Sequence, residues 1–213
     1  VGRLLPQSTY YACTSWQHFV DTGELANYIV PSGNVGNITA AFWAKQCGFP
    51  IGEISMSQNE NSTIKEYLDS SKYTAKASVE TLANAMDVGD PSNFERLLNL
   101  FGDYENFTKN IRTVCISDFE ITEEIKRVYE HYGEVVCPHT ATGFAAKEYY
   151  DTDKHYIIVA TAHPAKFESV IEPTLDINVP PTKELQELLD KKHHKVTITK
   201  NMNELCEVYS TLS

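Results

Sequence analysis

An α/β domain built around a layered parallel sheet is the fold class that the sequence predicts. Short apolar runs, typical of buried strands, alternate with segments of helical periodicity, which is the pattern of βαβ units. The clearest unit covers residues 26–57, where a strand, a glycine-rich turn, a helix and a second strand follow one another. The 213 residues suffice for one large domain or two small ones, with a core that needs no disulfide or metal.

The first half of the chain opens with a predicted helix over residues 3–20, with Pro6 in the first turn, where a missing N–H costs nothing. Residues 26–30 form a short apolar run before Pro-Ser-Gly, as expected of a buried strand. An apolar stripe closed by Gly48 predicts a helix over 37–47. A strand over 51–57 and a helix over 63–68 follow, and the least patterned stretch, 71–85, is expected to be mostly loop.

The second half continues the alternation of helices and strands. A clean apolar run predicts a strand over 156–160, and another strand is expected over 195–199. One predicted helix opens with Thr122-Glu123-Glu124 and closes at Gly133. The helices expected in this half cover residues 94–101, 121–132, 140–149, 182–192 and 202–212.

The composition is acidic: 29 Asp and Glu residues against 18 Lys and Arg give a formal net charge of -11. This balance disfavours nucleic acid or an anionic membrane as a partner, and nothing approaches the roughly 18 apolar residues of a transmembrane helix. The first thirty residues lack the apolar core of a signal peptide, and the five cysteines form no CxxC pair. These features predict a cytoplasmic protein with reduced thiols and no metal site. A phosphorylated small molecule is still compatible, because it needs only a local pocket.

The most informative motif is Pro31-Ser-Gly-Asn-Val-Gly-Asn37, between a strand and a helix. Its two glycines let the backbone turn tightly and approach a ligand. The helix start that follows offers unpaired N–H groups and a favourable dipole to an anion. Ligands of open parallel sheets bind at the carboxyl ends of strands, where this turn must lie. The alternative is an ordinary loop whose glycines only turn the chain; the motif is neither a Walker loop nor the dinucleotide fingerprint.

Other residues could also carry chemistry. Thr161 and His163 directly follow a predicted strand at the same ligand-binding edge; alternatively, they only satisfy loop backbone groups. Cys137 and His139 stand at a helix start and suggest a thiol–imidazole pair, although no third orienting group is evident. Arg3, at the start of the first helix, could bind a phosphate or carboxylate, or it could simply be solvated.

Six stretches, taken together, resemble the threonine synthase family. They occur in the family's order and cover roughly residues 1–170, whereas the last forty residues resemble the family's variable tail only weakly. Six motifs in order make a specific signal. They are Arg3-Leu-Leu-Pro-Gln7, Val30-Pro-Ser-Gly-Asn-Val-Gly-Asn37, Thr81-Leu-Ala-Asn-Ala-Met-Asp87, Ser92-Asn-Phe-Glu-Arg96, Pro138-His-Thr-Ala141 and Thr161-Ala-His-Pro-Ala-Lys-Phe167.

The resemblance implies the tryptophan-synthase-β-like fold of enzymes that use pyridoxal phosphate (PLP). Backbone N–H groups of the turn would cradle the cofactor phosphate. Thr161 would face the pyridine nitrogen, where a neutral hydroxyl leaves that nitrogen largely unprotonated. Arg3, with Asn37, would bind the phosphate of the substrate, a small phosphorylated amino acid. The implied cofactor-binding residues are Ser32, Gly33, Asn34, Val35, Gly36, Asn37 and Thr161.

The reaction implied by the resemblance is a lyase step of threonine biosynthesis, from O-phospho-L-homoserine and water to L-threonine and phosphate. The family's cofactor-bonding lysine belongs to a Phe-Lys-Asp stretch, which does not occur here. Lys166 does not map to it and is interpreted as structural. We therefore expect residues 1–213 to be the C-terminal part of such an enzyme: an excised fragment, starting without methionine, with no catalytic residue and inactive by itself.

A second departure from the family is Cys137, which stands where related enzymes often carry an acidic residue before the proline. This difference is expected to alter the surroundings of the cofactor ring. Two other functions are compatible with the sequence. One is a threonine-synthase-like lyase acting on a related phosphorylated substrate, and the other is a non-catalytic α/β binding module. The sequence does not determine the oligomeric state.

Overall fold

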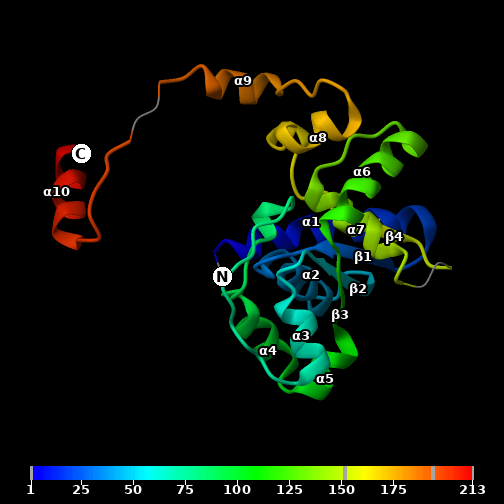
Figure 1. Cartoon of the computed structure of the whole chain (residues 1–213). Coiled ribbons are helices and arrows are strands. Elements are labelled where there is room, and N and C mark those ends of the chain that lie inside the picture. The colour runs from blue at the N-terminus through cyan, green and yellow to red at the C-terminus, as the bar shows by residue number, and fades with distance from the viewer. Residues whose placement is uncertain (1, 151–152, 193–194, 213) are drawn as a thin grey trace. The chain divides into compact units, whose positions relative to one another are not determined.

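The sheet contains four strands in the described part of the chain, in the order β3-β2-β1-β4, and each neighbouring pair is parallel (Figure 1). The structure is a computed structural model that describes residues 2–150, 153–192 and 195–212. The predicted α/β class with a parallel sheet is confirmed. The strands are β1 (Ala26–Pro31), β2 (Ile51–Gln58), β3 (Arg112–Cys115) and β4 (Tyr156–Ile158).

Helices connect the strands within the first of two compact units, Val1–Val179. Their ends follow local signals: Gly133 ends α6 in the left-handed conformation, and Ser117 begins it with a capping box to Glu120. No helix within the described ranges is long and apolar enough to cross a membrane. The elements are α1 (Leu4–Thr22), α2 (Gly36–Gln46), α3 (Thr63–Ser70), α4 (Phe94–Phe101), α5 (Tyr104–Asn110), α6 (Asp118–Tyr132), α7 (Pro138–Lys147) and α8 (Glu168–Leu175), with 3₁₀ turns η1 (Asn84–Met86) and η2 (Pro164–Lys166).

The second unit, Pro180–Ser213, contains α9 (Lys183–Leu189) and α10 (Met202–Leu212). The strand predicted over 195–199 is wrong, because these residues have irregular backbone. Thr199 donates through its N–H and its hydroxyl to the carboxylate of Glu204, in the first turn of α10. Residues 195–199 therefore lead into α10 and do not pair with a strand, although their apolar side chains alternate.

Helices cover both faces of the sheet. Tyr28 and Val30 of β1 pack on one face with side chains of α1 to α5, including Phe42 of α2. Ile29 packs on the other face with α6 and α7, where Ile125 is one of its partners in the cluster. Each large apolar side chain buried in this way contributes roughly 1.5–3 kcal/mol. Burial on both faces explains why the central strands read as nearly continuous apolar runs.

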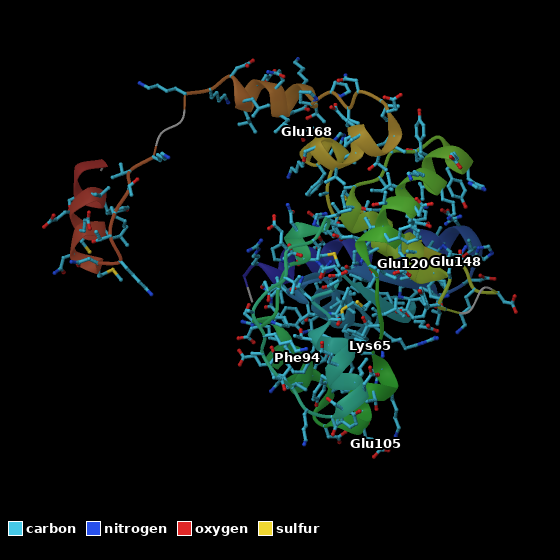
Figure 2. The ribbon with its side chains drawn as sticks, viewed as in Figure 1. Lys65, Phe94, Glu105, Glu120, Glu148 and Glu168 are labelled. Carbon is cyan, nitrogen blue, oxygen red and sulfur yellow. The ribbon has the colours of Figure 1, made fainter. Side chains whose placement is uncertain are left out.

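A cluster of aromatic rings joins α3, α4 and α5. Phe94, labelled in Figure 2, meets Tyr67 edge-on with 5.1 Å between ring centroids and stacks on Tyr73 at 4.4 Å. Phe107 of α5 contacts both Tyr67 and Phe94. Such pairs contribute about 0.5–1.5 kcal/mol beyond their buried area. Because Tyr73 lies in the irregular stretch after α3, the cluster also fixes the start of the segment that leads to η1.

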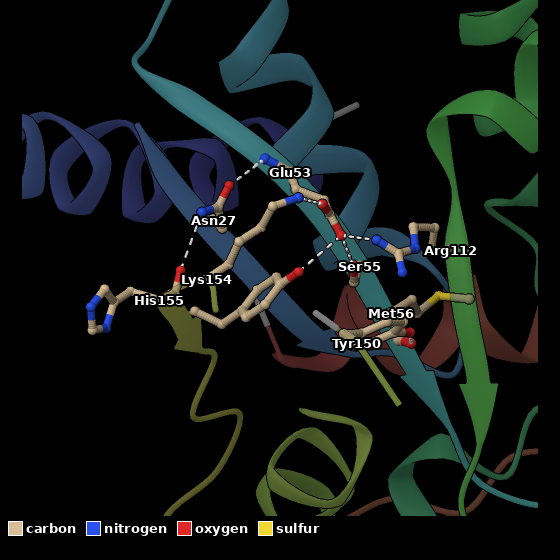
Figure 3. A network of polar contacts seen from close by, with 9 residues as sticks. Asn27, Glu53, Ser55, Met56, Arg112, Tyr150, Lys154 and His155 are labelled. Carbon is tan, nitrogen blue, oxygen red and sulfur yellow. Dashed lines mark hydrogen bonds and ion pairs between the residues drawn. The ribbon is translucent and has the colours of Figure 1, made fainter. Parts of the chain in front are cut away.

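Glu53 of β2 joins three strands at the amino-terminal edge of the sheet (Figure 3). Its carboxylate accepts bonds from Arg112 of β3 at 2.5 Å, from Lys154 at 2.8 Å and from Tyr156 of β4 at 3.0 Å. Burial raises the pKa of this carboxyl, but the bonds from Lys154 and Tyr156 and the charge of Arg112 outweigh burial and hold the pKa below its ordinary value. The network lies at the opposite edge from the loops that follow the strands, so it stabilises the scaffold.

Candidate functional site

A cleft of about 620 Å³ lies between α1 and the residues that follow β1 and β4. The carboxyl ends of parallel strands share one edge of a sheet, and ligands of open α/β sheets bind there. The cleft therefore gathers predicted site residues from distant parts of the chain. Val35 does not line it, because its side chain is buried in the core. The predicted residues that line the cleft are Arg3, Ser32, Gly33, Asn34, Gly36, Asn37 and Thr161.

The side chain of Asn37 stabilises the turn after β1 by three hydrogen bonds. Its Oδ1 accepts bonds from the hydroxyl of Ser32 at 2.5 Å and from the N–H of Ile38 at 3.0 Å. Its Nδ2 donates to the carbonyl of Pro31 at 2.8 Å. The Pro31 bond uses one of the two Nδ2 hydrogens, so the other can donate to a ligand.

Val35, not a glycine, adopts the left-handed backbone in this turn. Its φ is 48°, and it stands at the N-cap position of α2. This conformation costs a β-branched residue on the order of 1–3 kcal/mol, and burial of the Val35 side chain offsets the cost. The N-cap side chain makes no hydrogen bond to α2, and Asn37 Oδ1 takes the N–H of Ile38. The N–H groups of Gly36 and Asn37, which come before Ile38 in the first turn, can bind an anion.

Two other stretches hold this turn in place. A Cβ atom on Gly33 would lie 2.5 Å from the Cα of Met86, so only glycine fits against η1. Asn93 donates through Nδ2 to the carbonyl of Asn34 at 3.0 Å, and Ser92 donates to Asn34 Oδ1 at 3.1 Å. The side chain of Asn93 thus supports the turn and makes no capping bond to α4.

Asp87 ties η1 to the end of β2. Its Oδ1 accepts bonds from Asn59 Nδ2 at 2.7 Å and from Asn61 Nδ2 at 3.1 Å. Thr81 donates its hydroxyl to Oδ1 at 2.7 Å and its N–H to Oδ2 at 3.0 Å. Asn59, Asn61 and Thr81 are buried. These hydrogen bonds position η1 so that Met86 packs against Gly33 of the turn.

His139 of α7 binds η1 from another side. Its Nε2 accepts the N–H of Ala85 at 2.9 Å, so in a neutral imidazole the ring hydrogen is on Nδ1. The residue is 3% exposed, and burial lowers its pKa to about 4 although the charge of Asp87 acts in the opposite direction. The ring lies 4.6 Å from that of Phe167, measured between centroids. At neutral pH, His139 is therefore an uncharged donor in the cleft wall.

Thr161 is held at the cleft by the start of α7. Its N–H donates to the hydroxyl of Thr140 at 3.4 Å, and that hydroxyl contacts the Sγ of Cys137 at 3.2 Å. Cys137 is fully buried and caps α7, because its Sγ accepts the N–H of Thr140. The thiol–imidazole pair does not form: Cys137 bonds Thr140, while His139 bonds Ala85.

Arg3 stands at the N-cap position of α1, exposed at the cleft. Gln7 and Tyr11 follow at intervals of about one turn on the same helix face, and both line the cleft. The buried Gln7 Oε1 and Tyr11 hydroxyl have no hydrogen-bond partner among the described residues. Neither belongs to the predicted site; the helical spacing from Arg3 is the sequence signal that identifies them.

His163 caps η2 by accepting the N–H of Ala165 on Nδ1 at 3.2 Å. This satisfies a loop backbone group, as the simpler of the two predictions states. No group of three or more His, Cys, Asp and Glu side chains in the described ranges could hold a metal ion. His193 and His194 lie outside the described residues.

Comparisons with known proteins agree with the motifs. Residues 140–209 match the family model for the C-terminal part of threonine synthase. The curated threonine synthase of Haemophilus influenzae is 34% identical over 95% of this chain, and that of Saccharomyces cerevisiae is 33% identical over 82%. This chain is related to the threonine synthases. It spans about half the length of these relatives, 47% and 43% respectively.

Solved threonine synthases have the same fold over the matched half. The yeast enzyme gives a TM-score of 0.78 at 30% identity and covers 89% of this chain and 48% of its own. The PLP-bound threonine synthase from Brucella melitensis gives 0.84 at 24% identity, over 97% of this chain and 50% of that chain. A likeness at this lower identity is evidence of fold alone. The fold is thus that of the threonine synthases.

Proposed function

We propose that these 213 residues supply the cofactor-phosphate half of a threonine synthase, a lyase that converts O-phospho-L-homoserine and water to L-threonine and phosphate. The turn over residues 31–37 carries the proposal. It places the uncapped start of α2 at the carboxyl edge of a parallel sheet. The contacts of Gly33 with Met86 and of Asn34 with Asn93 hold the turn in that shape. The likeness to threonine synthases over nearly the whole chain supports the same function.

The residues of the cleft fit PLP. Backbone N–H groups from Gly33 to Gly36 would hold the cofactor phosphate, because a helix start that lacks a capping side chain binds anions. Thr161 would meet the pyridine nitrogen with an uncharged hydroxyl, which does not force protonation of that nitrogen. PLP supplies an electron sink for negative charge that develops on the substrate carbons.

The substrate phosphate would bind Arg3 and Asn37. The guanidinium of Arg3 offers a planar fork of donors that matches phosphate oxygens, and Asn37 adds a neutral donor at the turn. Both residues line the same cleft. Arg3 thus brings positive charge to the anion, although the chain as a whole is acidic.

We further propose that the cofactor-bonding lysine comes from outside these residues, because Phe-Lys-Asp does not occur among them. The 213 residues by themselves then bind the cofactor reversibly and do not turn over substrate. We place the protein in the cytoplasm, as the sequence predicts. Its partner is the phosphorylated amino-acid substrate, and neither nucleic acid nor a membrane surface is proposed.

Borohydride trapping tests this proposal on the 213-residue chain. After incubation with PLP and reduction, peptide mass spectrometry is expected to find no stoichiometric adduct on any one lysine. Equilibrium titration is expected to find reversible PLP binding that Asn37→Ala weakens. A stoichiometric lysine adduct contradicts the missing nucleophile. Absence of any PLP or phosphate binding contradicts the cofactor role and favours a non-catalytic module. Product analysis with O-phosphohomoserine on the complete enzyme separates threonine synthase from a lyase with a related substrate.

A further inference from the structure

Unpartnered polar atoms concentrate in the wall of the cleft. Five buried side-chain atoms of the described residues have no hydrogen-bond partner. Three of them belong to residues that line this one cleft: Gln7, Tyr11 and His139. A buried polar group without a partner is costly, and native proteins rarely keep one without a reason. Their concentration here indicates that a polar ligand completes the wall.

Among these three residues, His139 is the one whose hydrogen-bonding role the structure determines. Because Nε2 accepts the N–H of Ala85, the unpartnered Nδ1 carries the ring hydrogen and acts as a donor. The ring cannot easily turn away to another partner, since the Ala85 bond fixes one edge and Phe167 packs against it. The missing partner is therefore a hydrogen-bond acceptor, and a bound ligand has to supply it.

The surroundings of His139 indicate which acceptor this is. Ala85 is adjacent in sequence to Met86, which packs against the Gly33 of the phosphate-binding turn. Thr140, the next residue after His139, holds the backbone of Thr161. His139 thus bonds the neighbour of the residue that supports the turn and is itself the neighbour of the residue that holds Thr161, the two groups that would bind the phosphate and the ring nitrogen of PLP.

We propose that His139 is a ligand-binding residue whose Nδ1–H donates a hydrogen bond to an anionic oxygen of the phosphorylated ligand in the cleft. This inference rests on the proposed function, because it takes PLP as the ligand. The hydrogen bond from the Ala85 N–H to Nε2 fixes the tautomer in which Nδ1–H is the donor, as outer partners do for catalytic and metal-binding histidines.

Nitrogen-15 NMR of the histidines in the 213-residue chain tests the proposal directly. Before addition of ligand, His139 is expected to show a neutral ring with hydrogen on Nδ1. Addition of PLP is expected to shift that Nδ1–H resonance in the direction of a stronger hydrogen bond. His131 of α6, whose Nδ1 lies 2.9 Å from the carbonyl of Arg127, is an internal reference that should not move. A shift caused by inorganic phosphate alone assigns the acceptor to the phosphate; a shift caused only by PLP assigns it to the ring oxygen.

Two variants separate ligand binding from support of the fold. His139→Gln keeps an acceptor near the Nε2 position for Ala85 but removes the Nδ1 donor, so it should preserve thermal stability and weaken PLP binding roughly tenfold or more. His139→Asn keeps a donor near the Nδ1 position but loses the Ala85 bond. It should lose more stability and retain more PLP affinity than His139→Gln.

The outcomes distinguish failure of this inference from failure of the proposed function. If PLP shifts the amide resonances of Gly33 and Gly36 but leaves His139 unchanged, and His139→Gln binds as tightly as the wild type, then the role of His139 is refuted while the cofactor site stands. If PLP shifts none of these resonances, both proposals are contradicted. Shifts at the turn and at His139 together, with the expected loss in His139→Gln, support both.

Discussion

Gly33 and Met86 pack backbone against backbone. A Cβ atom added to Gly33 would lie 2.5 Å from the Cα of Met86 and 2.8 Å from its carbonyl oxygen. Such distances are far below van der Waals contact, so glycine is required here by close approach and not by a positive φ. The shape of the turn over residues 31–37 therefore depends on the position of η1.

Replacement of this glycine tests that dependence. Gly33→Ala must push the turn and η1 apart, which is expected to cost about 1–3 kcal/mol of unfolding free energy and to abolish PLP binding. Gly36→Ala is the matched comparison, because its added Cβ would first meet the side chain of Asn93 at 3.3 Å. Urea denaturation and PLP titration of both variants measure the difference. Equal effects of the two substitutions would show that the turn does not depend on the close approach of Gly33 to Met86.

Asp87 is predicted to be needed for both stability and ligand binding. Asp87→Ala removes the acceptor shared by Asn59, Asn61 and Thr81, and each of these buried donors loses a partner. The expected loss is roughly 2–4 kcal/mol, with weaker PLP binding because η1 is released. Asp90→Asn, which changes an exposed carboxylate that bonds only Tyr73 among the contacts described, should bind PLP normally. Normal PLP affinity in folded Asp87→Ala would refute the positioning role.

Cys137 is predicted to act as a helix cap that also positions Thr161. Cys137→Ala should lower stability by about 0.5–2 kcal/mol, the usual loss for a removed N-cap. Cys137→Ser keeps a capping acceptor and should lose less. Because Thr140 bridges Cys137 and the N–H of Thr161, the Thr161 amide resonance should move in the alanine variant more than in the serine variant. An unmoved Thr161 resonance in both variants would disprove the link.

Acid should weaken the fold through His139. Its pKa is about 4 in the folded chain against 6.5 ordinarily, so between these values the unfolded state holds more protons. The free energy of unfolding is unaffected by this titration above pH 6.5. It falls as the pH drops toward 4, by up to roughly 1.4 kcal/mol per pH unit. Because His139→Gln has no group that titrates here, denaturation at about pH 7 and about pH 5 should show the wild type losing stability relative to this variant as the pH falls. A constant difference would exclude this titration.

Glu53 provides a prediction about the scaffold, away from the cleft. Glu53→Gln removes the charge that pairs with Arg112 and Lys154, and these half-exposed partners make the expected loss only about 1 kcal/mol at neutral pH. The pKa of Glu53 is lowered, so its contribution is present above pH 4.5 and is lost as pH falls through the folded value. The wild type and the variant should therefore converge in acid. Exposed Glu105→Gln should change stability little, and PLP affinity should be unaffected in both.

The sequence predicts the parts of the fold whose signals are local and strong. The turn after β1 is bounded by an apolar run and a helical stripe, and its place at the carboxyl edge follows from the parallel sheet. The short β3, α5 and α8 are not predicted. β3 spans only four residues and begins with the exposed Arg112, and α8 contains Pro173, which reads as a helix breaker. Their existence depends on tertiary contacts.

Within the candidate site too, features that depend on tertiary contacts are not predicted from the sequence. Arg3 and Thr161 are found from motifs, but the left-handed conformation of Val35 is not, because a β-branched residue seldom adopts it. The partnership of His139 with Ala85 joins residues 54 positions apart. Sequence periodicity carries no information about such a contact. The role of His139 therefore depends on the folded chain.

A crystal structure of the 213-residue chain grown with PLP would show the proposed cofactor site itself. Phosphate density is expected within hydrogen-bond distance of the backbone N–H groups between Gly33 and Gly36, with the pyridine nitrogen at the hydroxyl of Thr161. PLP bound elsewhere, or a well-ordered turn without bound phosphate at saturating PLP, would refute this site.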